Sequence, residues 1–99
     1  MGASNEVVYE HLMESVFNLL PKDTDCDRYE EAVRDVRDHS AYGKAELAMA
    51  LYPIVSCGFT DDAAFYLLRV CADAAGVLNV LPDTASRAIA SAVPTPQET

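Results

Sequence analysis

Apolar side chains recur every three or four residues along most of this 99-residue chain, which is the spacing of one face of an α-helix. The clearest block covers residues 37–77 and predicts two helices joined by a glycine turn. The repeating apolar positions are Tyr42, Ala45, Ala48, Met49, Tyr52 and Val55 in the first helix, and Ala64, Phe65, Leu68, Cys71, Ala72 and Ala75 in the second.

Local signals predict where these two helices begin and end. The first should cover about 40–56, but Pro53 lacks an amide hydrogen and favours a kink or an early end near Leu51. Gly58 should end it, because glycine readily adopts the left-handed conformation found after helices. Thr60, followed by two carboxylates, should cap a second helix over 61–75, with Gly76 as its terminator.

Further helices are predicted on both sides of this block. Ser4 or Asn5 can cap a helix that runs to about Leu20 before Pro21. Its expected inner face is Val8, Leu12, Val16, Leu19 and Leu20. A second helix over about 25–38 has the apolar stripe Cys26, Tyr29, Ala32, Val33 and Val36. These two helices therefore precede the central pair.

The C-terminal part is less regular. Residues 77–81 are compatible with an extended segment or a helical turn, and Asp83 could cap a short helix through Ala92. The predicted fold is all-α, a compact bundle of four to five short, antiparallel helices in one domain over 1–93. Residues 94–99 should form a disordered tail.

Composition and charge exclude several classes of protein. Half of the residues are hydrophobic (51%), which is too many for a disordered acidic tail, so the chain should fold. No apolar run reaches the roughly 18 to 20 residues that span a bilayer, and the N-terminus lacks the basic and apolar regions of a secretory signal. We therefore expect a cytoplasmic protein that does not act on membranes.

Few residues have the spacing of a catalytic or metal site. Cys26, Cys57 and Cys71 contain no C-x-x-C pair, and we expect them to be reduced side chains of the core. The aspartates at 23, 25 and 27 open like a calcium loop, but arginine stands where that loop needs its glycine and its closing glutamate. His11 and His39 have no metal-pair spacing, although a Cys-His couple formed in space stays open. No cofactor is predicted, and the chain is not expected to be an enzyme.

Negative charge is the patterned chemical feature. The formal net charge is -9, and ten of the sixteen carboxylates precede His39. Glu6, Glu10 and Glu14 stand four residues apart and form one row along the first predicted helix. Such a surface either keeps a small domain soluble or steers it onto a basic partner, and it repels nucleic acid.

Part of the chain resembles the Maf-type immunity proteins of bacterial polymorphic toxin systems. The matching segments are YEEAV (29–33), HSAYGKAELA (39–48), LY (51–52), GFTDD (58–62), FYLL (65–68) and the AGV ending at 75–77. The resemblance implies an antidote that binds a cognate toxin, often a nuclease, and blocks it without catalysis.

The charge pattern and the resemblance together predict a partner-binding surface for a basic protein toxin. Its candidate residues are Glu30, Glu31, Asp35, Asp38, Asp61 and Asp62, with Tyr42, Tyr52 and Tyr66 as possible anchors. Two alternatives stay open. One is a phage-type acidic inhibitor or DNA mimic that acts on a nucleic-acid-binding machine, and the other is a small helical adaptor that uses a hydrophobic groove.

Overall fold

The computed structural model describes residues 5–93, which form five α-helices and no strand. The all-α fold predicted from the sequence is therefore confirmed. The helices are α1 (Asn5–Phe17), α2 (Cys26–Asp38), α3 (Lys44–Ser56), α4 (Asp61–Leu78) and α5 (Pro82–Ala92). The predicted disordered tail at 94–99 lies outside the described residues.

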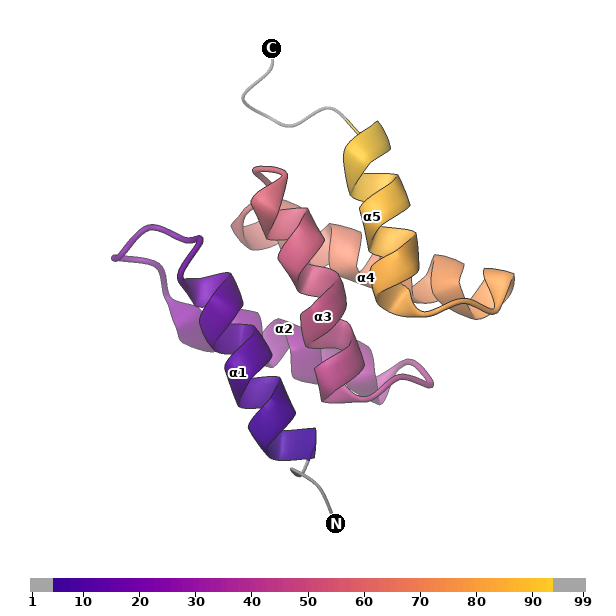
Figure 1. Ribbon diagram of the computed structural model, residues 1–99, viewed down its shortest axis with the longest axis horizontal. Coiled ribbons are helices and arrows are strands. Elements are labelled where there is room, and N and C mark those ends of the chain that lie inside the picture. Colours follow the sequence, from indigo (N-terminus) through magenta and orange to yellow (C-terminus); the bar gives the residue numbers. More distant parts are fainter. Residues whose placement is uncertain (1–4, 94–99) are drawn as a thin grey trace.

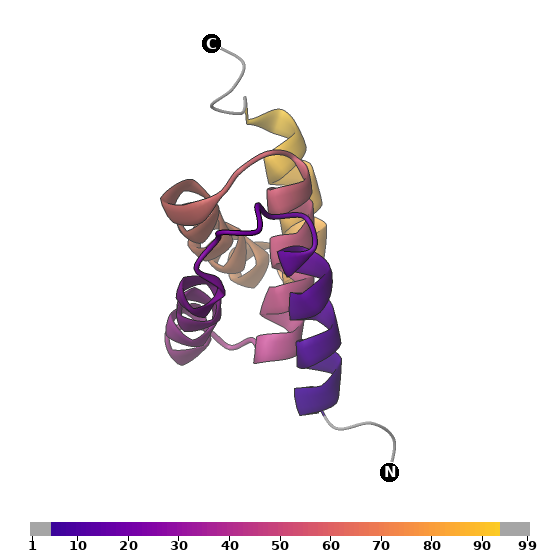
Figure 2. The same ribbon diagram turned by 90° about the vertical axis from the view of Figure 1, so that its left-hand side faces the viewer.

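The helices are arranged in two layers. Figure 1 shows α1, α3 and α5 side by side and running in the same direction, with α2 and α4 behind them. Figure 2 shows α2 and α4 nearly end on, so the second layer crosses the first steeply. The antiparallel arrangement expected from short connections is therefore wrong for the front layer. Each helix of the second layer returns the chain across the molecule. The front helices α1, α3 and α5 therefore all start from the same end of their layer.

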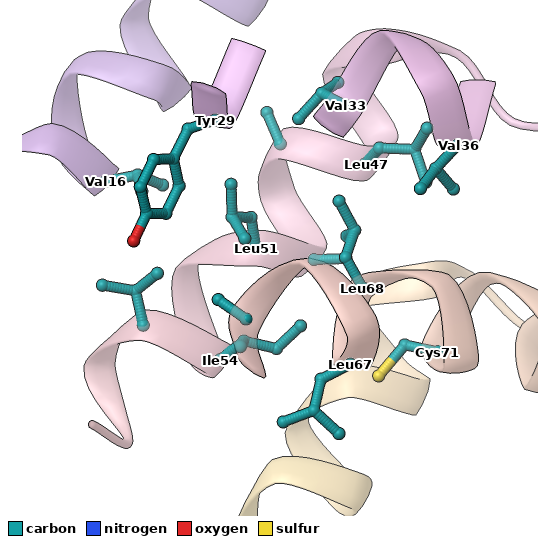
Figure 3. Close-up of a cluster of buried hydrophobic side chains, with 14 of the residues drawn as sticks. Val16, Tyr29, Val33, Val36, Leu47, Leu51, Ile54, Leu67, Leu68 and Cys71 are labelled. Carbon is teal, nitrogen blue, oxygen red and sulfur yellow. The ribbon is translucent and has the colours of Figure 1, made fainter. Parts of the chain in front are cut away.

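Helix α3 lies at the centre of the fold, where it packs on each of the other four helices. Its buried residues consequently cover a wide face and are Leu47, Ala48, Ala50, Leu51, Ile54 and Val55. Met49 and Tyr52, which the sequence pattern placed inside, are about 40% exposed because they lie on the remaining outer strip. Figure 3 shows the side chains of Leu51 and Ile54 among those of α2 and α4.

The inner face of α1 also differs from the prediction. Its buried residues are Tyr9, Met13 and Val16, and Leu20 just beyond the helix is buried with them. Val8 and Leu19 are exposed, while Leu12 packs only at the edge of the core. A helix with apolar residues at so many positions permits two neighbouring stripes, and the packing against α3 selects the one that contains Tyr9 and Met13.

The predicted ends of α1, α3, α4 and α5 need correction. Helix α1 stops at Phe17, and its last turn is closed by the hydrogen bond from the Leu19 amide to the Val16 carbonyl. Helix α3 begins only at Lys44, since the Gly43 amide donates to the Glu46 carboxylate at 2.9 Å as a cap. It then continues through Pro53 to Ser56 without an early end.

Helix α4 extends past Gly76 to Leu78, and Asn79 provides the left-handed residue with φ 59°. Residues 77–81 are thus the end of a helix and a loop rather than a strand. The loop is tied to the beginning of α3 by the Tyr42 hydroxyl, which donates to the Val80 carbonyl at 3.1 Å. In α5, Pro82 occupies the first turn and Asp83 follows inside the helix, so Asp83 is not its cap.

Candidate functional site

The six carboxylates predicted to bind a partner fall into different environments. Asp61 and Asp62 begin α4 beside the first turn of α2. The hydroxyl of fully buried Tyr29 accepts a hydrogen bond from the Asp61 amide at 2.6 Å and donates one to the Asp61 carboxylate at 3.0 Å. Tyr29 thus provides the cap that was expected from Thr60, whose side chain makes no capping hydrogen bond.

Burial is the main reason why the pKa of Tyr29 is raised to about 12, and the Asp61 carboxylate contributes to the shift. The Tyr29 ring also meets Phe65 edge to face, with the ring centroids 4.7 Å apart. Asp61 is therefore committed to the contact between α2 and α4. Its main role is structural, and a contact with a partner is secondary to that role.

The Asp62 carboxylate is exposed to solvent but already has an ion-pair partner. Its side chain is 91% exposed and pairs with the Arg28 guanidinium at 2.7 Å. Arg28 in turn lies over the Phe65 ring, 5.4 Å from its centroid. The pairing keeps the charge at the start of α4 partly neutralised.

Asp35, Asp38 and Glu31 of α2 lie on an exposed surface, where the ion pairs of the two aspartates are open to solvent. Asp35 is 3.9 Å from the Arg69 guanidinium of α4 and 3.7 Å from the His39 ring. Asp38 pairs with its neighbour Arg37 at 3.0 Å. Exposed pairs of this kind stabilise a fold by about 0 to 1 kcal/mol, so a partner can replace them. Glu31 is exposed as well.

Glu30 faces a different neighbour, because it lies at an open cavity between α1 and α2. The cavity has a volume of about 310 Å³. Its carboxylates are Glu30 and the α1 row of Glu6, Glu10 and Glu14, and its other lining residues are Tyr9, Met13 and Phe17. We call this the Tyr9 cavity. The structure therefore joins Glu30 to the α1 carboxylates rather than to Asp35 and Asp38.

The carboxylates of the Tyr9 cavity differ in their pairing. Glu6 accepts from the Lys44 ammonium at 2.9 Å, and Glu30 lies 3.9 Å from the Arg34 guanidinium. Within residues 5–93, Glu10 and Glu14 have no ion-pair partner. The row of glutamates was visible in the sequence, but its contact with Glu30 depends on how α1 and α2 are placed in space.

Tyr9 forms the inner wall of the cavity and is 4% exposed. Its hydroxyl is buried and has no hydrogen-bond partner in the described part of the chain. Lys44 lies over the ring, with its ammonium 4.5 Å from the centroid. Burial raises the pKa of the Tyr9 hydroxyl, and the Glu30 carboxylate adds to the effect.

The three tyrosines predicted as possible anchors differ in their exposure to solvent. Tyr42 is half-buried and bonded to Val80, whereas Tyr52 is 43% exposed and Tyr66 is 69% exposed. Tyr66, on the outer side of α4, is therefore the tyrosine most accessible to a partner. Tyr42 belongs to the fold.

Across residues 5–93, no three His, Cys, Asp or Glu side chains come together as a group that could hold a metal ion. The three cysteines are free, with Cys71 buried and the other two half-buried. Burial raises the pKa of the Cys71 thiol to about 11, which makes it a poor nucleophile at neutral pH.

Comparison with known proteins gives no relative for this chain. No family model matches it, and no curated protein or solved structure matches it either. The resemblance to Maf-type immunity proteins therefore stays a prediction. No helix in the described range is long and apolar enough to cross a membrane.

Proposed function

We propose that this chain is a non-enzymatic binding protein that docks on a basic protein, and that its partner is a cognate toxin, such as a nuclease, which it blocks. The observation that carries the proposal is the distribution of negative charge. Most carboxylates gather on α1, α2 and the connection between them, where most of them are exposed. Glu6 pairs with Lys44 at 2.9 Å, and the ion pairs of the α2 carboxylates are open to solvent.

A nuclease suits such a surface because it must hold a phosphate backbone with lysine and arginine. An acidic helical surface can occupy that cleft or a patch beside it. Charge then accelerates the encounter, and a few desolvated aromatic or aliphatic anchors supply most of the affinity. Tyr66 is suited to such an anchor role, since it is large, exposed and on the same layer as α2.

The test is co-expression of this chain with the adjacent gene, whose product is the expected toxin. We expect the wild-type chain to restore growth of cells that make the toxin. Reversal of Glu30, Glu31, Asp35 and Asp38 to lysine should weaken this protection, and circular dichroism should show a folded variant because these side chains lie outside the core. Undiminished protection by the variant would remove the α2 surface from the interface. Failure of the wild type to protect would remove the toxin hypothesis.

One observation favours the helical adaptor as a second candidate. Val77, Leu78 and Leu81 are 85%, 66% and 54% exposed at the end of α4 and in the following loop. No charged residue occurs in 74–82. An adaptor that binds through these side chains would associate at a rate that hardly depends on salt, whereas a charge-steered complex loses association rate as salt rises.

A further inference from the structure

The C-terminal end of the fold carries no net charge. It consists of the last turn of α4, the following loop and α5, and we call residues 76–93 the neutral end. Asp83 and Arg87 are its only charged residues, and they pair with each other at 3.8 Å. The net charge of -9 on the whole chain therefore lies outside this end.

The neutral end also exposes aliphatic side chains that the fold leaves uncovered. Val77 is 85% exposed, more than any other large hydrophobic residue in the described range, and Leu78 and Leu81 are 66% and 54% exposed. Single exposed apolar residues are ordinary, but a group of them marks an interaction surface. These three lie within five positions of the chain, so they form such a group.

The neutral end lies away from most of the acidic residues. Helix α5 packs on α3 and α4, and Figure 1 shows it at the edge of the front layer opposite α1, with the end of α4 at the same side. The outer side of this edge helix stays open. Its exposed positions Leu81, Thr84, Ala88 and Ala92 recur every three or four residues and so form one uncharged side.

We propose that the neutral end pairs with the neutral end of a second copy of this chain. Charge selects this occupant, because two copies that each carry -9 repel one another wherever their carboxylates approach. A contact through residues 76–93 keeps α1 and α2 of both copies at the outer ends of the pair. A two-fold contact uses the same patch on both copies, so the apolar side chains of one cover those of the other. The pairing does not depend on toxin binding.

The size of the neutral end sets the strength of the pair. Stable interfaces use about 20 to 30 residues and about 800 Å² on each partner. The neutral end has eleven exposed residues, which is about half of that number at most. We therefore expect a weak, reversible dimer that forms at high protein concentration. Salt should strengthen it, because salt screens the repulsion between the two acidic copies.

Sedimentation equilibrium of the full chain measures this association. Over protein concentrations from about 1 μM to 1 mM, the average mass should rise from that of a monomer toward that of a dimer. The rise should be larger at about 1 M salt than at about 0.1 M. A chain that stays monomeric throughout would overturn the proposal and leave Val77, Leu78 and Leu81 to a different protein. Masses beyond the dimer would overturn the two-fold contact.

Matched variants locate the contact. Leu78→Glu places a charge among the apolar side chains of both copies, and should raise the dissociation constant of the dimer by roughly tenfold or more. Leu19→Glu makes the same change at a 43% exposed position beyond α1, and should alter it by less than about twofold. Circular dichroism should show both variants folded, since both positions are exposed. Equal losses in the two variants would overturn the proposal.

NMR of the isotope-labelled protein provides an independent map of the contact. On dilution from high concentration, the amide shifts should change within residues 76–93 and stay constant on α1 and α2. Changes centred on α1 or α2 would overturn the pairing through the neutral end. Leu78→Glu should protect cells from the toxin as well as the wild type does, so the proposed function and the dimer fail separately.

Discussion

The Tyr29 hydroxyl joins α2 to the first residue of α4, accepting from the Asp61 amide at 2.6 Å and donating to the Asp61 carboxylate at 3.0 Å. Asp61 has φ 50°, a left-handed conformation that costs energy for a residue other than glycine. A buried tyrosine thus holds a strained helix start in place. This contact links α2 and α4, the two helices of the second layer, through residues that are 32 positions apart in the chain.

Tyr29→Phe should therefore destabilise the protein by about 1 to 3 kcal/mol, because it leaves the Asp61 amide without its acceptor. Urea unfolding followed by circular dichroism measures the change. Tyr66→Phe is the matched control and should cost almost nothing, since Tyr66 is 69% exposed. A Tyr29→Phe variant as stable as the wild type would mean that solvent replaces the hydroxyl at the start of α4.

The same contact predicts how stability depends on alkaline pH. The pKa of Tyr29 is about 12 in the fold against 10.0 in the unfolded chain. Because the raised value favours the neutral hydroxyl, its stabilising contribution is fully present below pH 10 and is lost as pH rises through 12. Between these values the free energy of unfolding should fall less steeply in Tyr29→Phe than in the wild type. Parallel pH profiles for the two proteins would contradict this assignment.

Leu68 tests the core of the fold. It is fully buried on α4 and labelled among the central side chains in Figure 3. Leu68→Ala should cost about 2 to 5 kcal/mol, the usual range for a deleted core leucine and its cavity. Leu78→Ala, on the same helix but 66% exposed, should change stability by less than about 0.5 kcal/mol. Similar melting temperatures for the two variants would show that the packing is wrong.

Two glycines should respond in opposite directions to replacement by alanine. Gly76 lies inside α4, and an added Cβ would meet nothing within 4 Å. Gly76→Ala should stabilise the protein by about 0.5 to 1 kcal/mol, because glycine is a poor helix former. Gly58 has φ 103°, so Gly58→Ala should destabilise it. Thermal melts of both variants provide the measurement, and destabilisation by Gly76→Ala would be evidence against a continuous α4.

The buried residues of a helix were predicted best where its apolar positions form only one stripe. In α2, Tyr29, Val33 and Val36 are buried as expected, and Leu68 and Cys71 are buried on α4. The stripe of α1 and the wide face of α3 were predicted less well, because both helices carry apolar residues in several directions. In such cases the neighbouring helices decide which side chains are buried, and periodicity alone cannot locate them.

The candidate site was only partly accessible from the sequence for a similar reason. Local spacing placed Glu6, Glu10 and Glu14 in one row, but nothing in the spacing joined them to Glu30 of the next helix. Asp61 was interpreted as a surface carboxylate, although the Tyr29 hydroxyl holds it for the fold. Contacts between residues far apart in the chain depend on the crossing of two layers, which a pattern of single helices does not contain.

If charge steers this chain onto a basic protein, the rate of association must depend on salt. The measurement is stopped-flow mixing with the product of the adjacent gene at ionic strengths from about 0.01 to 1 M, over which the screening length falls from about 30 to 3 Å. We expect a steep fall in association rate with salt and a slower rate for the Glu30, Glu31, Asp35 and Asp38 reversal at low salt. An association rate that is the same at all salt concentrations would show that charge does not steer the encounter.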